Sequence, residues 1–217
     1  EKVICQLRFP PLLKIDAEIP AEFQDRIRID FPNFAERSEW QVEIPKGLNI
    51  PPEIVKQAMQ SSGNKNYEFS SEDSTWKLNL TRSFIALTAN KYERWESFRA
   101  KLHNPLDALV DIYSPAYYSR IGLRYVNVIR RSALDLENAS WTELLQPHIL
   151  GVLCSDVGNY VQNSESKVEI KMSDEESIVR MITGLVETLD DGEICFKVDS
   201  DFYNANKTSI DSSLEKL

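Results

Sequence analysis

The arginines of one central segment are the residues best suited to bind a ligand. Residues 120–127 read RIGLRYVN, and side chains on a β-strand alternate between its two faces. Arg120, Gly122 and Arg124 are therefore expected on one face, with the apolar residues between them on the other. A guanidinium group suits carboxylate or phosphate, and glycine permits close approach, so this face predicts a site for an anionic ligand. The alternative is that these arginines pair with some of the 34 acidic residues, or lie on a solvated face of the sheet.

Two arginines from other parts of the chain are candidates for the same site. Arg8 lies on the polar side of an expected strand at residues 3–9, and Arg82 lies at a tight connection between two strands. If these strands neighbour the one at 120–127, the arginines line a concave basic pocket. The complete candidate anion site is Arg8, Arg82, Arg120, Arg124, Tyr125 and Asn127. Structural ion pairing is the alternative account of these residues.

Carboxylates gather near the end of the chain. Asp199 and Asp201 share a face of the last expected strand with Glu193, and Glu169 lies on a nearby strand. Paired carboxylates hold Mg²⁺ or perform acid–base chemistry, whereas a solvated sheet edge needs no such role.

The common catalytic and metal-binding signatures are missing. His103 and His148 are the only two histidines, and neither has a cysteine or carboxylate at a metal-ligand spacing. The three cysteines match no zinc pattern. Phosphate-loop, dinucleotide-binding, serine-hydrolase, zinc-protease and EF-hand signatures are all absent. We therefore expect no metal, no cofactor and no recognisable catalytic residue.

Composition and charge limit the classes of partner. The 217 residues carry a formal net charge of −9, and an acidic surface repels both the nucleic-acid backbone and an anionic membrane. No apolar run is long enough to span a bilayer, and no leader segment opens the chain. Unpaired cysteines suit a reducing compartment. We expect a soluble cytoplasmic protein that does not bind membranes, and the charge disfavours binding to nucleic acid.

Hydrophobic periodicity predicts the elements that must position these residues. Strands are expected at 3–9, 40–44, 67–69, 76–81, 84–88, 117–131, 167–172, 178–187 and 193–199, and helices at 20–31, 51–60, 92–112 and 140–150. Short hairpin connections imply antiparallel pairing. The expected fold is α+β, a predominantly antiparallel sheet of about eight or nine strands with about four helices packed on it. We expect a single domain over residues 1–217; the missing initiator Met and a helix expected at 209–217 leave truncation at both ends open.

Several segments together resemble a known family. They are LRFPPLL at 7–13, PAEFQ at 20–24, WKLNLTR at 76–82, YERWESF at 92–98 and RIGLRYVN at 120–127. These segments resemble a family of uncharacterised proteins distributed sporadically among bacteria and archaea, over roughly residues 3–130. Members of that family are usually longer. The resemblance implies no reaction, cofactor or catalytic residue, and the patchy distribution implies an accessory role, such as a defence-associated partner.

Three functions remain open. The leading hypothesis is a non-enzymatic binding or protein-interaction module with a protein partner or a second copy of itself, which predicts an exposed apolar patch or a self-complementary surface. The alternative is an enzyme or sensor that binds a nucleotide-like anion, which requires Arg120 and Arg124 to line a cleft without a carboxylate partner each. Single-stranded nucleic-acid binding through stacked tyrosines is the third, and the net charge of −9 disfavours it.

Overall fold

The computed structural model describes residues 1–39 and 64–210. The strand expected at 40–44, the helix expected at 51–60 and nearly all of the helix expected at 209–217 lie outside the described residues.

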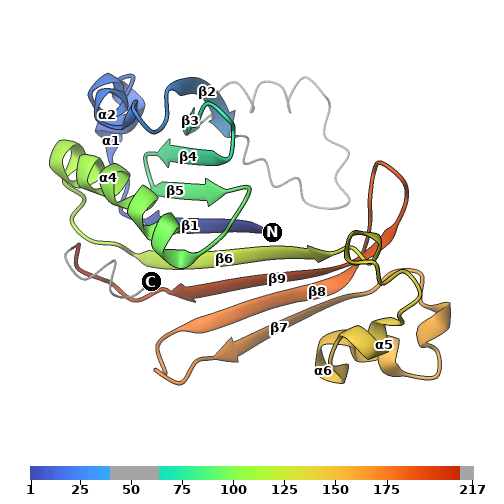
Figure 1. Cartoon of the computed structure of the whole chain (residues 1–217). Coiled ribbons are helices and arrows are strands. Elements are labelled where there is room, and N and C mark those ends of the chain that lie inside the picture. Colours follow the sequence, from blue (N-terminus) through green and yellow to red (C-terminus); the bar gives the residue numbers. More distant parts are fainter. Residues whose placement is uncertain (40–63, 211–217) are drawn as a thin grey trace, which may run out of the picture.

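The described residues form a nine-stranded antiparallel sheet in the order β2-β3-β4-β5-β1-β6-β9-β8-β7 (Figure 1). The strands are β1 (Lys2–Arg8), β2 (Asn33–Glu39), β3 (Asn64–Ser70), β4 (Trp76–Thr81), β5 (Phe84–Ala89), β6 (Arg120–Ile129), β7 (Glu165–Lys171), β8 (Ile178–Glu187) and β9 (Ile194–Asn204). Together with the helices, this sheet confirms the α+β class and the predominantly antiparallel pairing.

The first strand of the chain lies inside the sheet. β1 pairs with β5 on one side and with β6 on the other, so it joins the β2–β5 meander to the long strands β6, β9 and β8. Val3, Cys5 and Leu7 are fully buried on one face of β1, which is the alternation expected of a strand with one covered face. The opposite face of β1 carries Arg8, placed directly opposite Arg120.

Five α-helices occur in the described part of the chain. They are α1 (Leu13–Ala17), α2 (Ala21–Ile27), α4 (Trp95–Tyr113), α5 (Trp141–Leu144) and α6 (Pro147–Leu150). The helix expected at 140–150 is in fact two, because Leu145 and Gln146 adopt extended backbone before Pro147 and the residue before a proline disfavours the helical region. The capping box of Ser140 and Glu143 is present, and Glu143 Oε2 accepts from the Ser140 N–H at 2.7 Å. None of the helices of the described residues is both long and apolar enough to cross a membrane.

The strand β2 was not expected from the sequence. It lies at the sheet edge beside β3, and its sequence NFAERSE has too few apolar residues to show a clear alternation. An edge strand with one pairing partner needs less apolar surface than a central strand, which explains the weak pattern.

One row of apolar side chains crosses the whole sheet. The strand register places in line Phe34, Phe69, Leu78, Leu87, Cys5, Leu123, Phe202, Val179 and Ile170, from β2 to β7. Helices α2 and α4 pack over the part of this row between β3 and β6, where Phe23 contacts Phe69, Phe98 contacts Trp76, and both join a continuous core. Helices α5 and α6 lie apart from them, at the far end of the long strands (Figure 1). The helix-bearing face therefore has an unevenly covered stretch on β9, β8 and β7.

Candidate binding surfaces on the two faces of strands β6 and β9

The alternation expected for residues 120–127 gives the polar face of β6. Arg120, Gly122 and Arg124 lie opposite Arg8, Gln6 and Ile4 of β1, respectively, so the neighbourhood of Arg8 and Arg120 is as the sequence suggested. A pocket of about 370 Å³ opens here. Its lining residues are Ile4, Gln6, Arg8, Arg120, Gly122, Arg124, Arg180 and Asp201.

Two of the pocket arginines are held by carboxylates of β9. Arg120 Nη2 donates to both carboxylate oxygens of Asp201 at 2.9 and 2.8 Å. Arg124 donates from Nε and Nη2 to Asp199 at 2.7 and 2.6 Å, and this hydrogen bonding raises the pKa of Arg124. Asp199 is only 5% exposed, so it would be a costly buried charge without its arginine. The ion-pair alternative describes both arginines correctly.

Gly122 makes the Arg120 pairing possible. Asp201 lies opposite Arg124 rather than opposite Arg120, so the Arg120 side chain must run along its own strand to reach it. The guanidinium lies across Gly122, where a Cβ would collide with Nη1. It also stacks over the ring of Tyr203 at 4.6 Å from the centroid. The glycine is therefore explained by the close approach of a neighbouring side chain and not by that of a ligand.

Of the other four residues of the candidate anion site, only Arg8 lies in the pocket. Arg8 is exposed in the pocket and has no ion-pair partner among the described residues. Arg82 lies away from the pocket lining and 3.5 Å from Asp16. Tyr125 and Asn127 lie on the opposite face of β6, because they have odd positions in the alternation. The six residues thus do not converge, and three of them, Arg8, Arg120 and Arg124, share the pocket.

Arg180 was missed in the sequence and belongs to this pocket. It lies on β8 opposite Asp201, its guanidinium lies 5.6 Å from the Tyr203 ring centroid, and its Nε donates to Glu169 at 2.7 Å. A polar residue within the apolar run of residues 178–182 was the available signal. Its distance in sequence from the other arginines hid the connection.

The carboxylates and the histidine considered as possible metal-binding or catalytic groups form ion pairs and surface contacts instead. Asp199, Asp201 and Glu169 each pair with an arginine, and no three metal-binding side chains cluster anywhere in residues 1–39 and 64–210. His103 does have a carboxylate neighbour, because its Nδ1 lies 3.1 Å from Asp107 Oδ2 one helical turn away. Both side chains are exposed on α4, so this pair has the geometry of a helix-surface contact.

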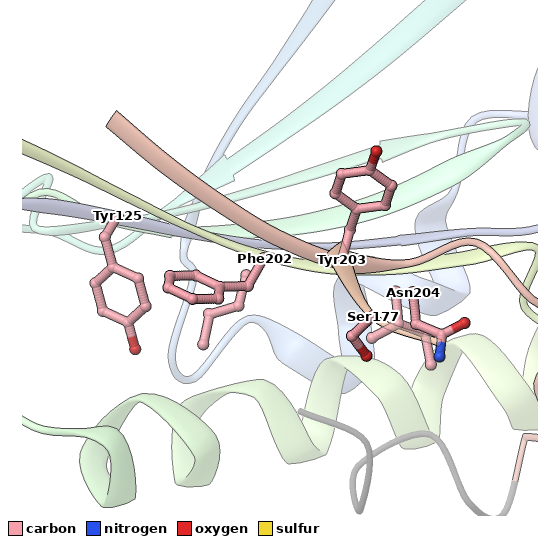
Figure 2. Close-up of a pocket in the computed structure, with 8 residues that line it drawn as sticks. Tyr125, Ser177, Phe202, Tyr203 and Asn204 are labelled. Atoms are coloured by element: carbon pink, nitrogen blue, oxygen red, sulfur yellow. The ribbon is translucent and has the colours of Figure 1, made fainter. Parts of the chain in front are cut away.

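The helix-bearing face of the same strands carries a second, apolar pocket of about 260 Å³ (Figure 2). Its lining residues are Ile121, Gly122, Leu123, Tyr125, Ser177, Phe202, Tyr203 and Asn204. Figure 2 shows Tyr125, Phe202, Ser177 and Asn204 pointing toward the side of the sheet on which α4 lies, whereas Tyr203 points away. We call this pocket the apolar groove.

Aromatic side chains shape the apolar groove. The rings of Tyr125 and Phe202 meet edge to face, with centroids 6.2 Å apart, and Tyr92 meets the other side of Tyr125 at 5.6 Å. Burial raises the pKa of Tyr125, with a further contribution from its hydrogen bond with Tyr92. Phe202 nevertheless remains 38% exposed. A rigid aromatic surface that stays partly open to solvent suits contact with another apolar group.

Neither of two comparisons identifies a relative. No protein-family model matches the chain, and no curated protein matches it. The resemblance to a sporadically distributed family of uncharacterised proteins therefore stays a prediction.

Proposed function

We propose that the chain is a protein-interaction module that holds an apolar segment of a partner protein in the apolar groove. The supporting observation is the uneven cover of the apolar row. Leu123 on β6 is 9% exposed, whereas Phe202 on β9 and Ile170 on β7 are 38% and 45% exposed. Val179, which lies between Phe202 and Ile170 in the row, is only 8% exposed, so Phe202 and Ile170 are separate exposed positions. An exposed aromatic side chain beside a formed pocket suits contact with an apolar group of a partner.

The dimensions of the groove favour a polypeptide segment over a free metabolite. Its volume of about 260 Å³ is below the range of about 300–1,000 Å³ typical of small-molecule sites. The groove is lined mainly by aromatic and aliphatic side chains. Ser177 and Asn204 lie at one end, where their side chains already hydrogen-bond to Asp174 and to Glu176 and Asn206. One or two apolar side chains of a partner fit this arrangement.

The setting we propose is the cytoplasm of a prokaryotic cell, with an accessory role. The two buried cysteines, Cys5 and Cys195, are unpaired, which suits a reducing compartment. The accessory role rests on the resemblance to a sporadically distributed family.

Selection of short peptides displayed on phage against the whole chain tests this function. Selected peptides should carry aromatic or branched aliphatic residues, and Phe202→Ser should weaken their binding by about tenfold or more, since apolar anchors dominate such contacts. The matched control is Val128→Ser, because Val128 is 50% exposed but lies on the opposite face. Failure to select any binder, or equal losses in both variants, would contradict the proposal.

Anion binding is a second candidate, favoured by one observation. Four arginines line the polar pocket, and three of them are paired with Asp201, Asp199 and Glu169. Arg8 is left as an excess positive charge in a protein of net charge −9. The pairing of both Arg120 and Arg124 counts against the version of this hypothesis that requires them to be unpaired.

A thermal-shift screen with inorganic phosphate, nucleotides and Mg²⁺ tests the second candidate. A ligand at 100 times its dissociation constant stabilises the native state by about 2.7 kcal/mol. The stabilisation should be lost in Arg8→Ala and retained in Arg28→Ala, whose side chain is exposed outside the pocket. Absence of any shift with all three ligand types would remove this candidate.

A further inference from the structure

The edge strand β7 offers a second interaction surface, on the far side of the sheet from β2. Among the described residues it is hydrogen-bonded to β8 only, and all seven of its residues are exposed. Figure 1 shows it at the rim of the sheet. The strand contains no proline, and its register with β8 is continuous without a bulge, so two common protections of an edge strand are missing.

The direction of the unpaired backbone groups follows from two hydrogen bonds beside the strand. Met172 donates its N–H to Ser177 at 2.8 Å, and the carbonyl of Ser164 accepts from Leu185 at 3.0 Å. In an antiparallel ladder the N–H and C=O of one residue point the same way, and the direction alternates along the strand. The even-numbered residues of β7 therefore point toward β8. The odd-numbered residues, at 165, 167, 169 and 171, point their N–H and C=O groups outward.

The same four residues carry alternating charges. They are Glu165, Lys167, Glu169 and Lys171. If a second copy pairs antiparallel with its own β7 about a two-fold axis at Val168, Glu165 lies opposite Lys171 of the second copy, and Lys167 lies opposite Glu169 of the second copy. Every cross-strand charge pair is then attractive, and each of these outward-pointing pairs can exchange two backbone hydrogen bonds.

Neighbouring registers are disfavoured by the same charges. Outward-pointing residues must oppose each other, so the register can move only in steps of two residues. A step in one direction places Lys167 opposite Lys167 of the second copy, and a step in the other places Glu169 opposite Glu169. All facing charges are then alike, which is destabilising. The sequence of β7 is thus complementary to itself in the register centred on Val168.

The apolar side chains of β7 fit this register as well. Val168 and Ile170 lie on the helix-bearing face and are 40% and 45% exposed. Val168 would meet Val168 of the second copy at the axis, beside Ile170 of both copies. The exposed end of the apolar row would then adjoin the same end of a second row.

We propose that two copies of the chain associate through β7, antiparallel and in the register centred on Val168, to form one continuous sheet across a two-fold axis. This proposal does not depend on the apolar groove as a binding site, because Phe202 lies two strands away from β7. The proposed contact is a single pair of seven-residue strands, whereas stable interfaces bury about 1,200–2,000 Å². We expect a concentration-dependent equilibrium between monomer and dimer.

Sedimentation equilibrium of the whole chain at low salt, with charge variants, tests the pairing. Glu165→Lys places lysine opposite Lys171 of the second copy twice in the dimer, and Lys171→Glu places glutamate opposite Glu165 twice. Each should weaken association by about tenfold or more, given roughly 0.2–1 kcal/mol for each pair and a change of sign. An equimolar mixture of the two variants should form a mixed dimer about as tight as the wild type, because all facing charges are again opposite.

Two controls keep the outcome clear. Glu137→Lys makes the same change of net charge as Glu165→Lys, at an exposed position outside β7, and it should leave association unchanged. Lys167→Pro removes one outward N–H while leaving the hydrogen bonds to β8, and it should abolish the dimer in a protein with native circular dichroism. A chain that stays monomeric at its highest soluble concentration overturns the proposal. So does a dimer that survives both charge variants unchanged, or a mixture of the two that fails to associate.

Discussion

The close contact between Gly122 and the Arg120 side chain leads to a prediction about Gly122→Ala. The sign of its effect on the free energy of unfolding should depend on whether residue 120 is arginine or alanine. A Cβ at position 122 would collide with Nη1 of Arg120, so Gly122→Ala must push this guanidinium away. The displaced Arg120 loses its two hydrogen bonds to Asp201 and its stacking on Tyr203. Both hydrogen bonds come from the single donor Nη2 and go to one carboxylate, so we count them together as one hydrogen bond to a charged group, about 1.5–3 kcal/mol. An exposed cation–π contact adds about 0.5–1 kcal/mol. Both partners of the pair are only 20% exposed, so water replaces little of this loss.

An entropic effect of the substitution partly offsets this loss of stability. Alanine lowers the conformational entropy of the unfolded chain, which stabilises the folded protein by about 0.4–1 kcal/mol where the backbone accepts it. Gly122 has no positive φ, so an L-residue fits its backbone. We expect Gly122→Ala to lower the free energy of unfolding by about 1–3 kcal/mol in the wild type. In an Arg120→Ala background the obstacle is gone, and the same change should raise it by about 0.5 kcal/mol.

Urea unfolding of the wild type, both single variants and the double variant measures this coupling. The quantity of interest is the difference between the effects of Gly122→Ala in the two backgrounds. Equal effects in both backgrounds would refute the reasoning, because they would show that the methyl group meets something other than the Arg120 side chain.

Three further predictions concern single groups. Asp199→Asn should lower the free energy of unfolding by about 1–3 kcal/mol. Asp199 is 5% exposed, and an amide in its place presents an NH₂ donor to the Arg124 donors and leaves a buried polar group unsatisfied. Asp111→Asn, in a pair whose side chains are 46% and 58% exposed, should cost less than about 1 kcal/mol, and equal losses in urea unfolding would contradict this. The hydroxyl of Ser71, followed by the hydroxyl and N–H of Thr75, lowers the pKa of Asp73 from 3.8 to about 2; its contribution to stability is therefore complete above pH 3.8 and is lost as the pH falls toward 2. Asp73→Asn should make the free energy of unfolding less dependent on pH between pH 2 and 3.8. An unchanged pH dependence would contradict the hydrogen bonds of Ser71 and Thr75 to Asp73. Cys5 is fully buried, which raises its thiol pKa to about 12, whereas Cys154 is exposed; a thiol reagent should therefore react rapidly with the native chain at Cys154 only, and a fast reaction that persists in Cys154→Ser would contradict the burial.

The sequence predicted the candidate site in part, and the parts of the prediction that were wrong have a common cause. The faces of Arg120, Gly122 and Arg124 followed from strand alternation, which depends only on local backbone geometry. Their partners did not, because Asp199 and Asp201 are 75 and 81 residues away in sequence from Arg124 and Arg120. Both carboxylates had been noted as possible metal ligands. Only the placement of β9 beside β6 shows that they neutralise the arginines.

The sequence by itself determined the class of this fold. Alternating apolar residues and short turns dictated antiparallel hairpins, and Ser140 with Glu143 dictated a helix start, because these signals act between residues close in the chain. The charges of β7 were also legible in its sequence. The tertiary structure decided the rest: that β1 lies between β5 and β6, that Arg180 joins the pocket of Arg8, and that β7 is left at the edge. Strand order is set by the burial of the whole apolar row at once, and no local pattern contains that information.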